Sequence, residues 1–368
     1  MENRFQALLM GLVLGAAIVY LFMPIAQAPG PAGNRPAAAE SADGKARPEV
    51  RAGNTLAEVR NRGELVCGVN QGLPGFSNPD DKGHWSGIDV DYCRALASAI
   101  FDDPTKVKFR PLNAKDRFTA LQSGEIDILS RNTTWTMSRD TQLGLDFAGV
   151  SYYDGQGFIV HKDSGIENAA DLDGATICTQ TGTTTELNVA DYFRSHGYKY
   201  KVLSYEKNDE ALAAYDNHRC DAYTTDASGL AAVRLKMKDP SQHRILPEII
   251  SKEPLGPAVR QGDPQWADIA RWTLFALINA DELGVTSKNV EEMKGSDSPR
   301  VRRLLGGEGA YGHMIGLTDD WVVRIIRHVG NYSEVFERNV GTNTKLGIER
   351  GLNALWNKGG IMYAPPIR

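Results

Sequence analysis

Hydrophobic and polar positions follow two alternating periods along most of the chain after Asn54. Short apolar runs rich in β-branched residues are followed by stretches in which apolar residues recur every three or four positions. This alternation is typical of βα units built around a mostly parallel sheet. A first series of elements is predicted as strands at 64–69, 106–111 and 126–129 and helices at 88–101 and 115–122.

A second series repeats the order of the first, with strands at 175–179, 200–205 and 220–224 and helices at 184–196, 209–217 and 227–236. We therefore expect an α/β fold with two doubly wound lobes. Extended segments at 155–160 and 256–259 indicate that the chain crosses into the second lobe and returns, which makes a hinge. The predicted boundaries are 54–157 and 254–368 for the first lobe and 158–253 for the second.

The rest of the chain is predicted to be helical and to pack back on the first lobe. The expected helices span 264–283, 290–294, 321–339 and 348–356.

The amino terminus has a different pattern. Arg4 precedes an apolar run at 7–23, and Ala26-Gln27-Ala28 is the small-residue pattern that a signal peptidase reads. The run is about 25 Å long as a helix, short of a bilayer core of roughly 30 Å. Pro29 is a poor residue to follow a cleavage site, so residues 1–28 are either an export signal or an uncleaved anchor. Pro, Ala and Gly dominate 29–53, which is typical of a flexible linker.

Charge excludes one class of partner. The 46 acidic and 41 basic residues are mixed along the chain and leave a net charge of −5. No extended basic stripe is present, so we do not expect nucleic acid to bind.

Four cysteines are spaced too widely for a zinc knuckle and contain no C-x-x-C pair: Cys67, Cys93, Cys178 and Cys220. In an exported protein an even number suggests disulfides. We expect one bond within each half, Cys67 with Cys93 and Cys178 with Cys220. The alternative is buried free thiols.

The segment 181–186, Thr-Gly-Thr-Thr-Thr-Glu, joins a predicted strand to a predicted helix. Thr183 and Glu186 fit the S/T-x-x-E capping box. The unpaired amides of a helix start also form a site for a small anion such as a carboxylate. The segment is thus either a helix cap alone or a cap that also holds a ligand.

In the first lobe, the loop at 130–134 follows a strand directly, and Arg139 comes shortly after it. Ligands of open α/β sheets bind outside the carboxyl ends of the strands, where this loop must lie. The planar fork of an arginine matches a carboxylate. The alternative is a surface arginine paired with Asp140, worth at most about 1 kcal/mol.

Asp226 stands at the carboxyl end of the strand predicted in the second lobe. It is either the N-cap of the next helix or an acceptor for an ammonium group. A carboxylate held near Arg139 and Thr184 together with an ammonium held near Asp226 describes an α-amino acid.

Known catalytic and cofactor motifs are absent or out of context. Gly307, Gly309 and Gly312 satisfy G-x-G-x-x-G, but the residues before them are charged and helical rather than a buried strand. No P-loop, G-x-S-x-G or H-E-x-x-H pattern occurs, and the histidines have no metal-ligand spacing. We expect no metal and no cofactor.

Several longer motifs lie at 67–76, 87–91, 117–127, 223–226 and 362–368. They resemble those of the polar amino-acid family of periplasmic solute-binding proteins of ABC transporters, and within it the general L-amino-acid-binding members. The resemblance covers nearly all of 55–368. It implies a type II periplasmic binding fold with an interlobe cleft that closes on its ligand, and a monomer that delivers L-amino acids to permease subunits in the inner membrane.

The resemblance also implies roles for individual residues. Thr134 and Arg139 are expected to hold the α-carboxylate from the first lobe, Thr183 and Thr184 from the second, and Asp226 the α-amino group. Three aromatic residues are either pocket wall or core: Phe76, Trp85 and Tyr152. Asn132 stands where relatives often carry serine.

Two rival functions remain at this point. One is a dehydratase-like enzyme on the same scaffold, which needs a carboxylic acid with a raised pKa in the cleft. The other is a membrane-tethered sensor domain, consistent with an uncleaved leader. A large pocket that holds only the groups common to all amino acids would bind many of them. A buried charged residue against the ligand side chain would favour one kind of amino acid.

Overall fold

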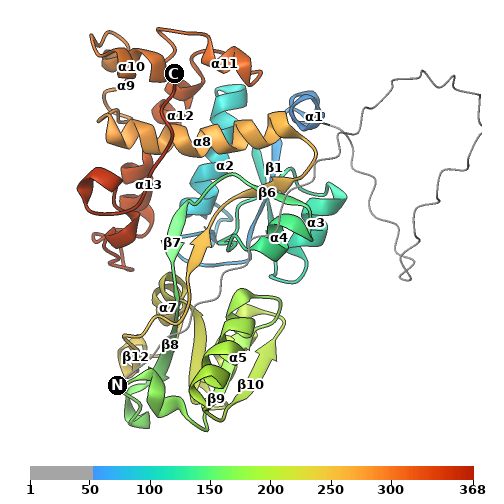
Figure 1. The fold of residues 1–368 in the computed structure, drawn as a ribbon, viewed down its shortest axis with the longest axis vertical. Helices are drawn as coiled ribbons and strands as arrows, with labels where there is room; N and C mark the ends of the chain where they lie inside the picture. The colour runs from blue at the N-terminus through green and yellow to red at the C-terminus, as the bar shows by residue number, and fades with distance from the viewer. Residues whose placement is uncertain (1–52) are drawn as a thin grey trace, which may run out of the picture. The chain divides into compact units, whose positions relative to one another are not determined.

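The computed structural model describes residues 53–368. The predicted leader and all but the last residue of the predicted linker lie outside them. The described strands form two five-stranded sheets and two smaller two-stranded ones (Figure 1). Each five-stranded sheet with its helices is called a lobe below. The prediction of an α/β fold with two lobes is confirmed.

The first lobe is built on the sheet β4-β1-β5-β14-β6. β1 pairs in parallel with β4 and β5, whereas β14 is antiparallel to its neighbours. The strands are β1 (Leu65–Asn70), β4 (Val107–Leu112), β5 (Ile128–Leu129), β6 (Leu145–Phe147) and β14 (Ala258–Arg260), and the helices α1 (Thr55–Arg62), α2 (Ile88–Phe101), α3 (Arg117–Ser123) and α4 (Met137–Thr141). A short hairpin precedes α2, formed by β2 (Asn78–Pro79) and β3 (Trp85–Ser86).

The start of α2 depends on a glycine. Gly87 has a φ of +130°, and a Cβ there would lie 2.0 Å from the carbonyl oxygen of Phe76. Only a residue without a side chain allows this approach. The turn fixes the first turn of α2, which carries Asp89 against the loop that follows β5.

The second lobe is built on the sheet β10-β9-β11-β8-β12. Its strands are β8 (Gln156–His161), β9 (Thr176–Gln180), β10 (Lys201–Tyr205), β11 (Ala222–Asp226) and β12 (His243–Ile245), and its helices α5 (Thr184–His196), α6 (Asn208–Asp216) and α7 (Ala227–Arg234). Phe158, Ile177 and Phe193 are fully buried in its core. Removing these large apolar side chains from water stabilises the lobe.

Two short strands connect the lobes. The chain leaves the first sheet through β7 (Tyr152–Asp154) and returns through β13 (Glu253–Leu255). The two strands pair antiparallel, with Asp154 opposite Glu253. Figure 1 shows them side by side between the sheets. The lobe boundaries themselves remain a prediction.

The C-terminal helices pack on the first lobe, α8 and α12 against α2 in particular. They are α8 (Pro264–Glu282), α9 (Val290–Met293), α10 (Pro299–Leu304), α11 (Tyr311–Met314), α12 (Trp321–Val329) and α13 (Tyr332–Asn339).

Two expectations for this region were wrong. The single helix predicted at 321–339 is divided because Gly330 leaves the helix at a φ of +85° and Asn331 caps a new one in a capping box with Glu334. The helix predicted at 348–356 is absent from the described structure, which has single 3-10 turns at Gly351–Asn353 and Trp356–Lys358. Gly347 and Gly351, both at positive φ, interrupt the helical spacing.

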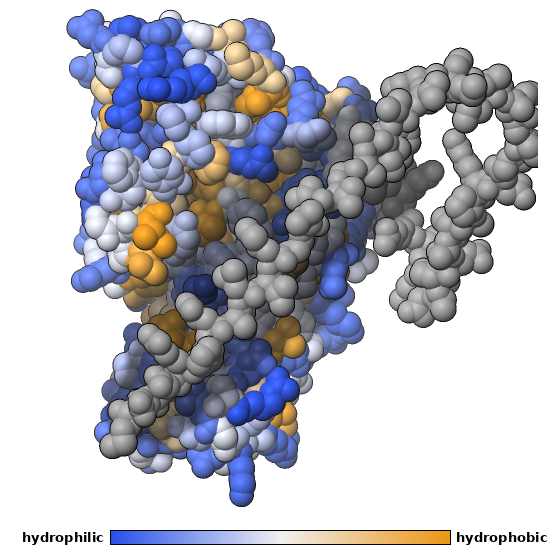
Figure 2. Space-filling model, in the orientation of Figure 1, coloured by the Kyte–Doolittle hydropathy of each residue, from blue (hydrophilic) through white to orange (hydrophobic). Residues whose placement is uncertain are grey.

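The face seen in Figure 2 is mostly hydrophilic, with small apolar patches beside the C-terminal helices. Exposed apolar side chains of the last residues include Leu352, Trp356, Ile361 and Tyr363. No helix within residues 53–368 combines the length and the apolar content needed to cross a bilayer.

All four cysteines form disulfides. Cys67 on β1 is bonded to Cys93 on α2, and Cys178 on β9 to Cys220 just before β11. The predicted pairing within each half is confirmed, and the alternative of free thiols is wrong. Each bond ties a strand to a neighbouring element inside one lobe.

Reducing the disulfides should lower the stability of each lobe separately. The bonds close loops of 26 and 42 residues, which in the chain-entropy picture correspond to about 3.5 and about 4 kcal/mol. Urea unfolding of Cys67→Ala/Cys93→Ala and Cys178→Ala/Cys220→Ala measures each contribution. A free energy of unfolding unchanged in either double variant would contradict a structural role for that bond.

Candidate functional site

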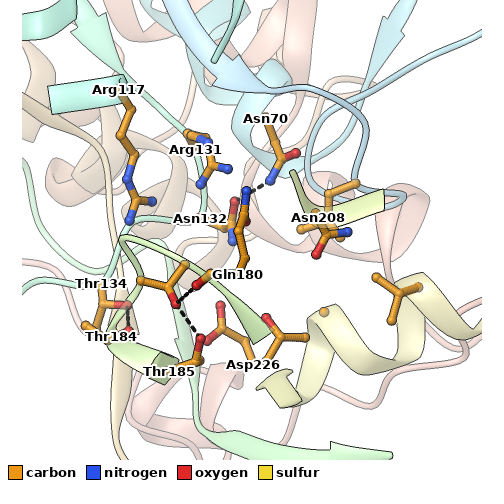
Figure 3. Close-up of a pocket in the computed structure, with 15 residues that line it drawn as sticks. Asn70, Arg117, Arg131, Asn132, Thr134, Gln180, Thr184, Thr185, Asn208 and Asp226 are labelled. Carbon is orange, nitrogen blue, oxygen red and sulfur yellow. Dashed lines mark hydrogen bonds between the residues drawn. The ribbon is translucent and has the colours of Figure 1, made fainter. Parts of the chain in front are cut away.

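A polar cavity opens between the lobes (Figure 3). The first lobe lines it with Asn70, Leu73, Arg117, Arg131, Asn132 and Thr134, and the second with Gln180, Thr183, Thr184, Thr185, Asn208, Thr225, Asp226, Gly229 and Val233. Asn70, Gln180 and Asp226 each end a strand. The cavity thus lies where open α/β sheets bind their ligands.

Asp226 is not used as a helix cap. It occupies the N-cap position of α7 but accepts no capping hydrogen bond with its side chain. Asp154 does this instead, because its carboxylate accepts from the amide and the hydroxyl of Ser228 in the first turn. The carboxylate of Asp226 is therefore left for the cavity, which it lines.

Two carboxylic acids at the start of α7, Asp226 and Asp154, lose their protons less readily than ordinary aspartates. Burial raises the pKa of Asp226 well above its ordinary value, and the nearby charges of Asp154 and Glu253 raise it further. A hydrogen bond from the side-chain amide of Asn132 lowers the pKa of Asp226. Burial likewise raises the pKa of Asp154 to about 6. A cation placed against Asp226 would relieve this cost.

The start of α5 forms half of the predicted capping box. Thr183 accepts the amide of Glu186 at 3.3 Å. The Glu186 carboxylate binds the amide of Gly182 at 3.1 Å rather than that of Thr183. Thr183 and Thr184 both line the cavity, so the cap also faces a potential ligand.

Thr134 and Thr184 meet at a buried carboxylate. Their hydroxyls donate to Oε2 of Glu253 at 2.6 and 2.8 Å, and Oε1 accepts from Asn188 at 2.7 Å and Ser251 at 2.6 Å. Glu253 is 1% exposed and lies on the connecting strand β13. One carboxylate thus joins a residue of each lobe to the connection between them.

Arg139 lies behind the cavity wall. It is buried, donates from Nη1 to the carbonyl oxygen of Thr134 at 2.8 Å, and packs over the ring of Phe118 at 5.1 Å. It is not among the residues that line the cavity. The alternative of a surface arginine paired with Asp140 does not describe it, because the side chain is 7% exposed.

Sequence reasoning missed two arginines that do line the cavity. Arg117 begins α3, and Arg131 lies in the loop after β5. Arg131 belongs to the segment 130–134 that sequence analysis singled out, and its place after a strand could have identified it. Arg117 had no such signal, because it reads as an ordinary residue of an amphipathic helix.

The three aromatic candidates belong to packed clusters rather than to the cavity wall. The Phe76 ring meets Tyr152 edge-on at 5.3 Å, and Tyr152 stacks on Phe336 at 6.1 Å. Trp85 packs on Phe109 at 6.0 Å. Phe76, Trp85 and Tyr152 are absent from the lining. Of the two alternatives, pocket wall or core, this packing favours core, because the apolar surface of the three rings is already in contact with other aromatic side chains.

Nothing in the described residues suggests a metal or dinucleotide site. No group of three or more potential ligands within 53–368 is arranged to hold a metal ion. Gly307 and Gly309 follow α10, and Gly312 lies within α11, so no strand leads into the G-x-G-x-x-G pattern.

The family model for bacterial extracellular solute-binding proteins, family 3, matches residues 65–289. The chain belongs to this family. The general L-amino acid-binding periplasmic protein AapJ of Rhizobium johnstonii is 60% identical over 85% of this chain and 93% of its own. The glutamate/glutamine/aspartate/asparagine-binding protein BztA of Rhodobacter capsulatus is 54% identical over 86% of this chain and 94% of its own.

A solved structure shares the fold at high identity. It is an ABC transporter periplasmic binding protein of Brucella ovis with glutathione bound, 63% identical, with a TM-score of 0.84 over 86% of this chain and 99% of that one. The solved structure therefore agrees with the two-lobed architecture.

Replacing Glu253 with alanine should lower the free energy of unfolding by about 3 kcal/mol, because it leaves buried hydroxyl and amide donors without acceptors. Ser251→Ala, which removes one of the donors, is the matched control and should cost about 1 kcal/mol. Urea unfolding monitored by circular dichroism measures both. A cost for Glu253→Ala no larger than that of the control would contradict the bridging role.

Proposed function

We propose that the chain captures free L-amino acids, polar and acidic ones among them, and delivers them to the permease subunits of an ABC importer. The observation that supports this most directly is the pairing of charges across the cavity. Asp226 presents a carboxylate that is not used for capping, and guanidinium groups face the same space from the other lobe (Figure 3). A zwitterionic α-amino acid complements both.

In this proposal, Asp226 holds the α-ammonium group. Thr134, Thr183 and Thr184, which line the cavity, are the proposed anchors of the α-carboxylate. Arg139, which lies behind the wall and donates to the carbonyl oxygen of Thr134, is proposed to turn into the cavity and join them when the ligand binds. Each threonine hydroxyl carries a single proton, and those of Thr134 and Thr184 are donated to Glu253 in the described conformation. Ligand binding must therefore redirect these donors. That exchange couples occupancy of the cleft to the connection between the lobes.

The family and its relatives support the cellular setting. We propose that the protein is exported to the periplasm, with residues 1–28 as signal or anchor, and that it acts as a monomer. Closure on the ligand is the change that the permease subunits would recognise.

Binding is favoured over the dehydratase alternative by electrostatics. A dehydratase needs a protonated acid in the cleft, and the raised pKa of Asp226 meets that requirement in the free protein. A ligand ammonium group against Asp226 lowers that pKa again and leaves a carboxylate that cannot act as an acid. Asp226 thus suits recognition better than proton transfer.

Asp226→Asn should weaken amino-acid binding at least about 100-fold. A charge-assisted contact contributes about 1.5–3 kcal/mol, and its loss leaves the ammonium group of the ligand buried without an opposite charge. Calorimetric titration of the full-length chain with the twenty amino acids measures the affinities. Arg139→Met should also abolish binding. Asp191→Asn, at an exposed ion pair with Arg194, is the control and should bind normally. Unchanged binding in Asp226→Asn would contradict the assignment.

Acidification should weaken amino-acid binding. Because the pKa of Asp226 is raised above 3.8, this group becomes neutral at a higher pH than an ordinary aspartate and loses its attraction for the ammonium. Affinity should therefore rise as the pH increases through the pKa of Asp226 and then level off. Asp226→Asn should remove this dependence. A wild-type affinity independent of pH over that range would count against Asp226 as the ammonium partner.

A further inference from the structure

The strand β7, through which the chain leaves the first lobe, is paired with β13 on one edge only. In the register of this pair, Tyr153 stands opposite Pro254. Pro254 has no backbone N–H and cannot donate to Tyr153. Its carbonyl oxygen accepts the amide of Trp135 at 2.8 Å and so points away from β7. The amide and the carbonyl group of Tyr153 therefore need partners on the other edge of β7.

Asn353 supplies both of these partners. Its Oδ1 accepts the amide of Tyr153 at 2.7 Å, and its Nδ2 donates to the carbonyl oxygen of Tyr153 at 3.0 Å. A side-chain carboxamide offers the same donor and acceptor as a peptide group, so Asn353 takes the place of a neighbouring strand. Asn353 is 4% exposed. Loss of its side chain would leave two backbone groups of the hinge strand without partners.

Two further contacts hold the chain where it enters β7. The hydroxyl of Tyr332 donates to the carbonyl oxygen of Ser151 at 2.8 Å, and the ring of Phe336 stacks on Tyr152 at 6.1 Å. Three consecutive residues of the crossing are thus each held by the segment 332–353, which we call the C-terminal clamp. The whole clamp lies after the residues that the family model matches.

Arg350 anchors the clamp to α8. It donates from both Nη groups to Asp281 at 3.2 Å and from Nε to the carbonyl oxygen of Asn353 at 2.9 Å. Its guanidinium group also lies 5.0 Å from the ring centre of Tyr332 and 5.3 Å from that of Phe336. Because Asp281 is buried, these charge-assisted contacts are shielded from solvent. The residues that hold β7 are therefore fixed to a helix that packs on the first lobe.

The next residues of the crossing are bound to the second lobe instead. The carboxylate of Asp154 accepts from Ser228 at the start of α7, and the carbonyl oxygen of Gly155 accepts the amide of Ala227 at 2.7 Å. The change from one lobe to the other thus falls between Tyr153 and Asp154. On this crossing, a rotation of the lobes must be absorbed by the backbone dihedral angles at that point.

We infer that the C-terminal clamp fixes the pivot of lobe closure, and that Asn353 is the positioning residue that sets how readily the lobes close. The inference rests on the proposed function, because closure on a ligand is part of it, but Asn353 does not line the cavity. With the clamp in place, β7 moves as part of the first lobe. Without it, β7 gains conformational freedom that closure must remove, and the lost entropy opposes binding.

The first test is calorimetric titration of the full-length chain and of Asn353→Ala with two amino acids of unlike side chain, L-glutamate and L-alanine. Asn353→Ala should weaken both by the same factor, about 3- to 10-fold, because it changes the hinge and not the cavity. Asn279→Ala is the matched control. Asn279 is also buried and also bonds the C-terminal residues, but it donates to Phe275 and Pro365 rather than to β7. This control should lower stability and leave both affinities unchanged.

A second measurement separates a hinge role from a general loss of stability. All four native cysteines are in disulfides, so Lys108→Cys on β4 and Lys201→Cys on β10 can carry one spin label in each lobe. In the ligand-free chain, Asn353→Ala should broaden the distribution of distances between the labels. Tyr332→Phe, which removes only the hydroxyl bonded to Ser151, should broaden it less.

Two results would overturn the inference while leaving amino-acid binding intact. One is wild-type affinity together with wild-type label distances in Asn353→Ala, which would make Asn353 a purely structural residue. The other is a loss confined to one of the two amino acids, which would place the effect in the cavity. Should Asn353→Ala fail to fold, the label distances of Tyr332→Phe decide. Absence of binding by the wild type would contradict the proposed function, and the distances in the ligand-free chain would still test the clamp.

Discussion

The two lobes are joined at one buried carboxylate. Glu253 lies on the strand that returns the chain to the first lobe, and it accepts the hydroxyls of Thr134 from one lobe and Thr184 from the other. A buried carboxylate is tolerated only when its lone pairs are satisfied, so the positions of both threonines are fixed by the needs of Glu253. The cavity wall on this side follows from that constraint.

A second feature, the capping of α7 by Asp154, leaves the carboxylate of Asp226 available to a ligand. Asp154 caps α7 from the strand opposite Glu253 and so replaces Asp226 in that role. Asp226 then keeps its carboxylate in the cavity at the expense of a raised pKa. In the first lobe, Asp89 fixes the loop after β5 by accepting a hydrogen bond from the backbone amide of Asn132. Arg131 in the same loop donates from Nε to a carbonyl oxygen, and its Nη groups remain unbound. Neutral donors thus satisfy Glu253, Asp154 and Asp89, whereas Asp226 lines the cavity.

Much of this arrangement could be predicted from the sequence. Periodicity identified α2 and α5 with their observed bounds, because α2 begins after a glycine and α5 after a threonine cap. Thr183, Thr184 and Asp226 were predicted from their places at or just after the carboxyl ends of strands, and all three line the cavity. Glu253 was not predicted, because its role depends on a contact with Thr134, more than a hundred positions away. Arg117 was not predicted either, because its place depends on packing that periodicity does not record. The break at Gly330 was missed because the apolar spacing continues through it.

A crystal structure of the full-length chain with L-glutamate tests the central claim most directly. The account predicts electron density for the ligand between the lobes, with its ammonium group on Asp226. A ligand bound outside this cavity, or one held there with no contact to Asp226, would contradict it.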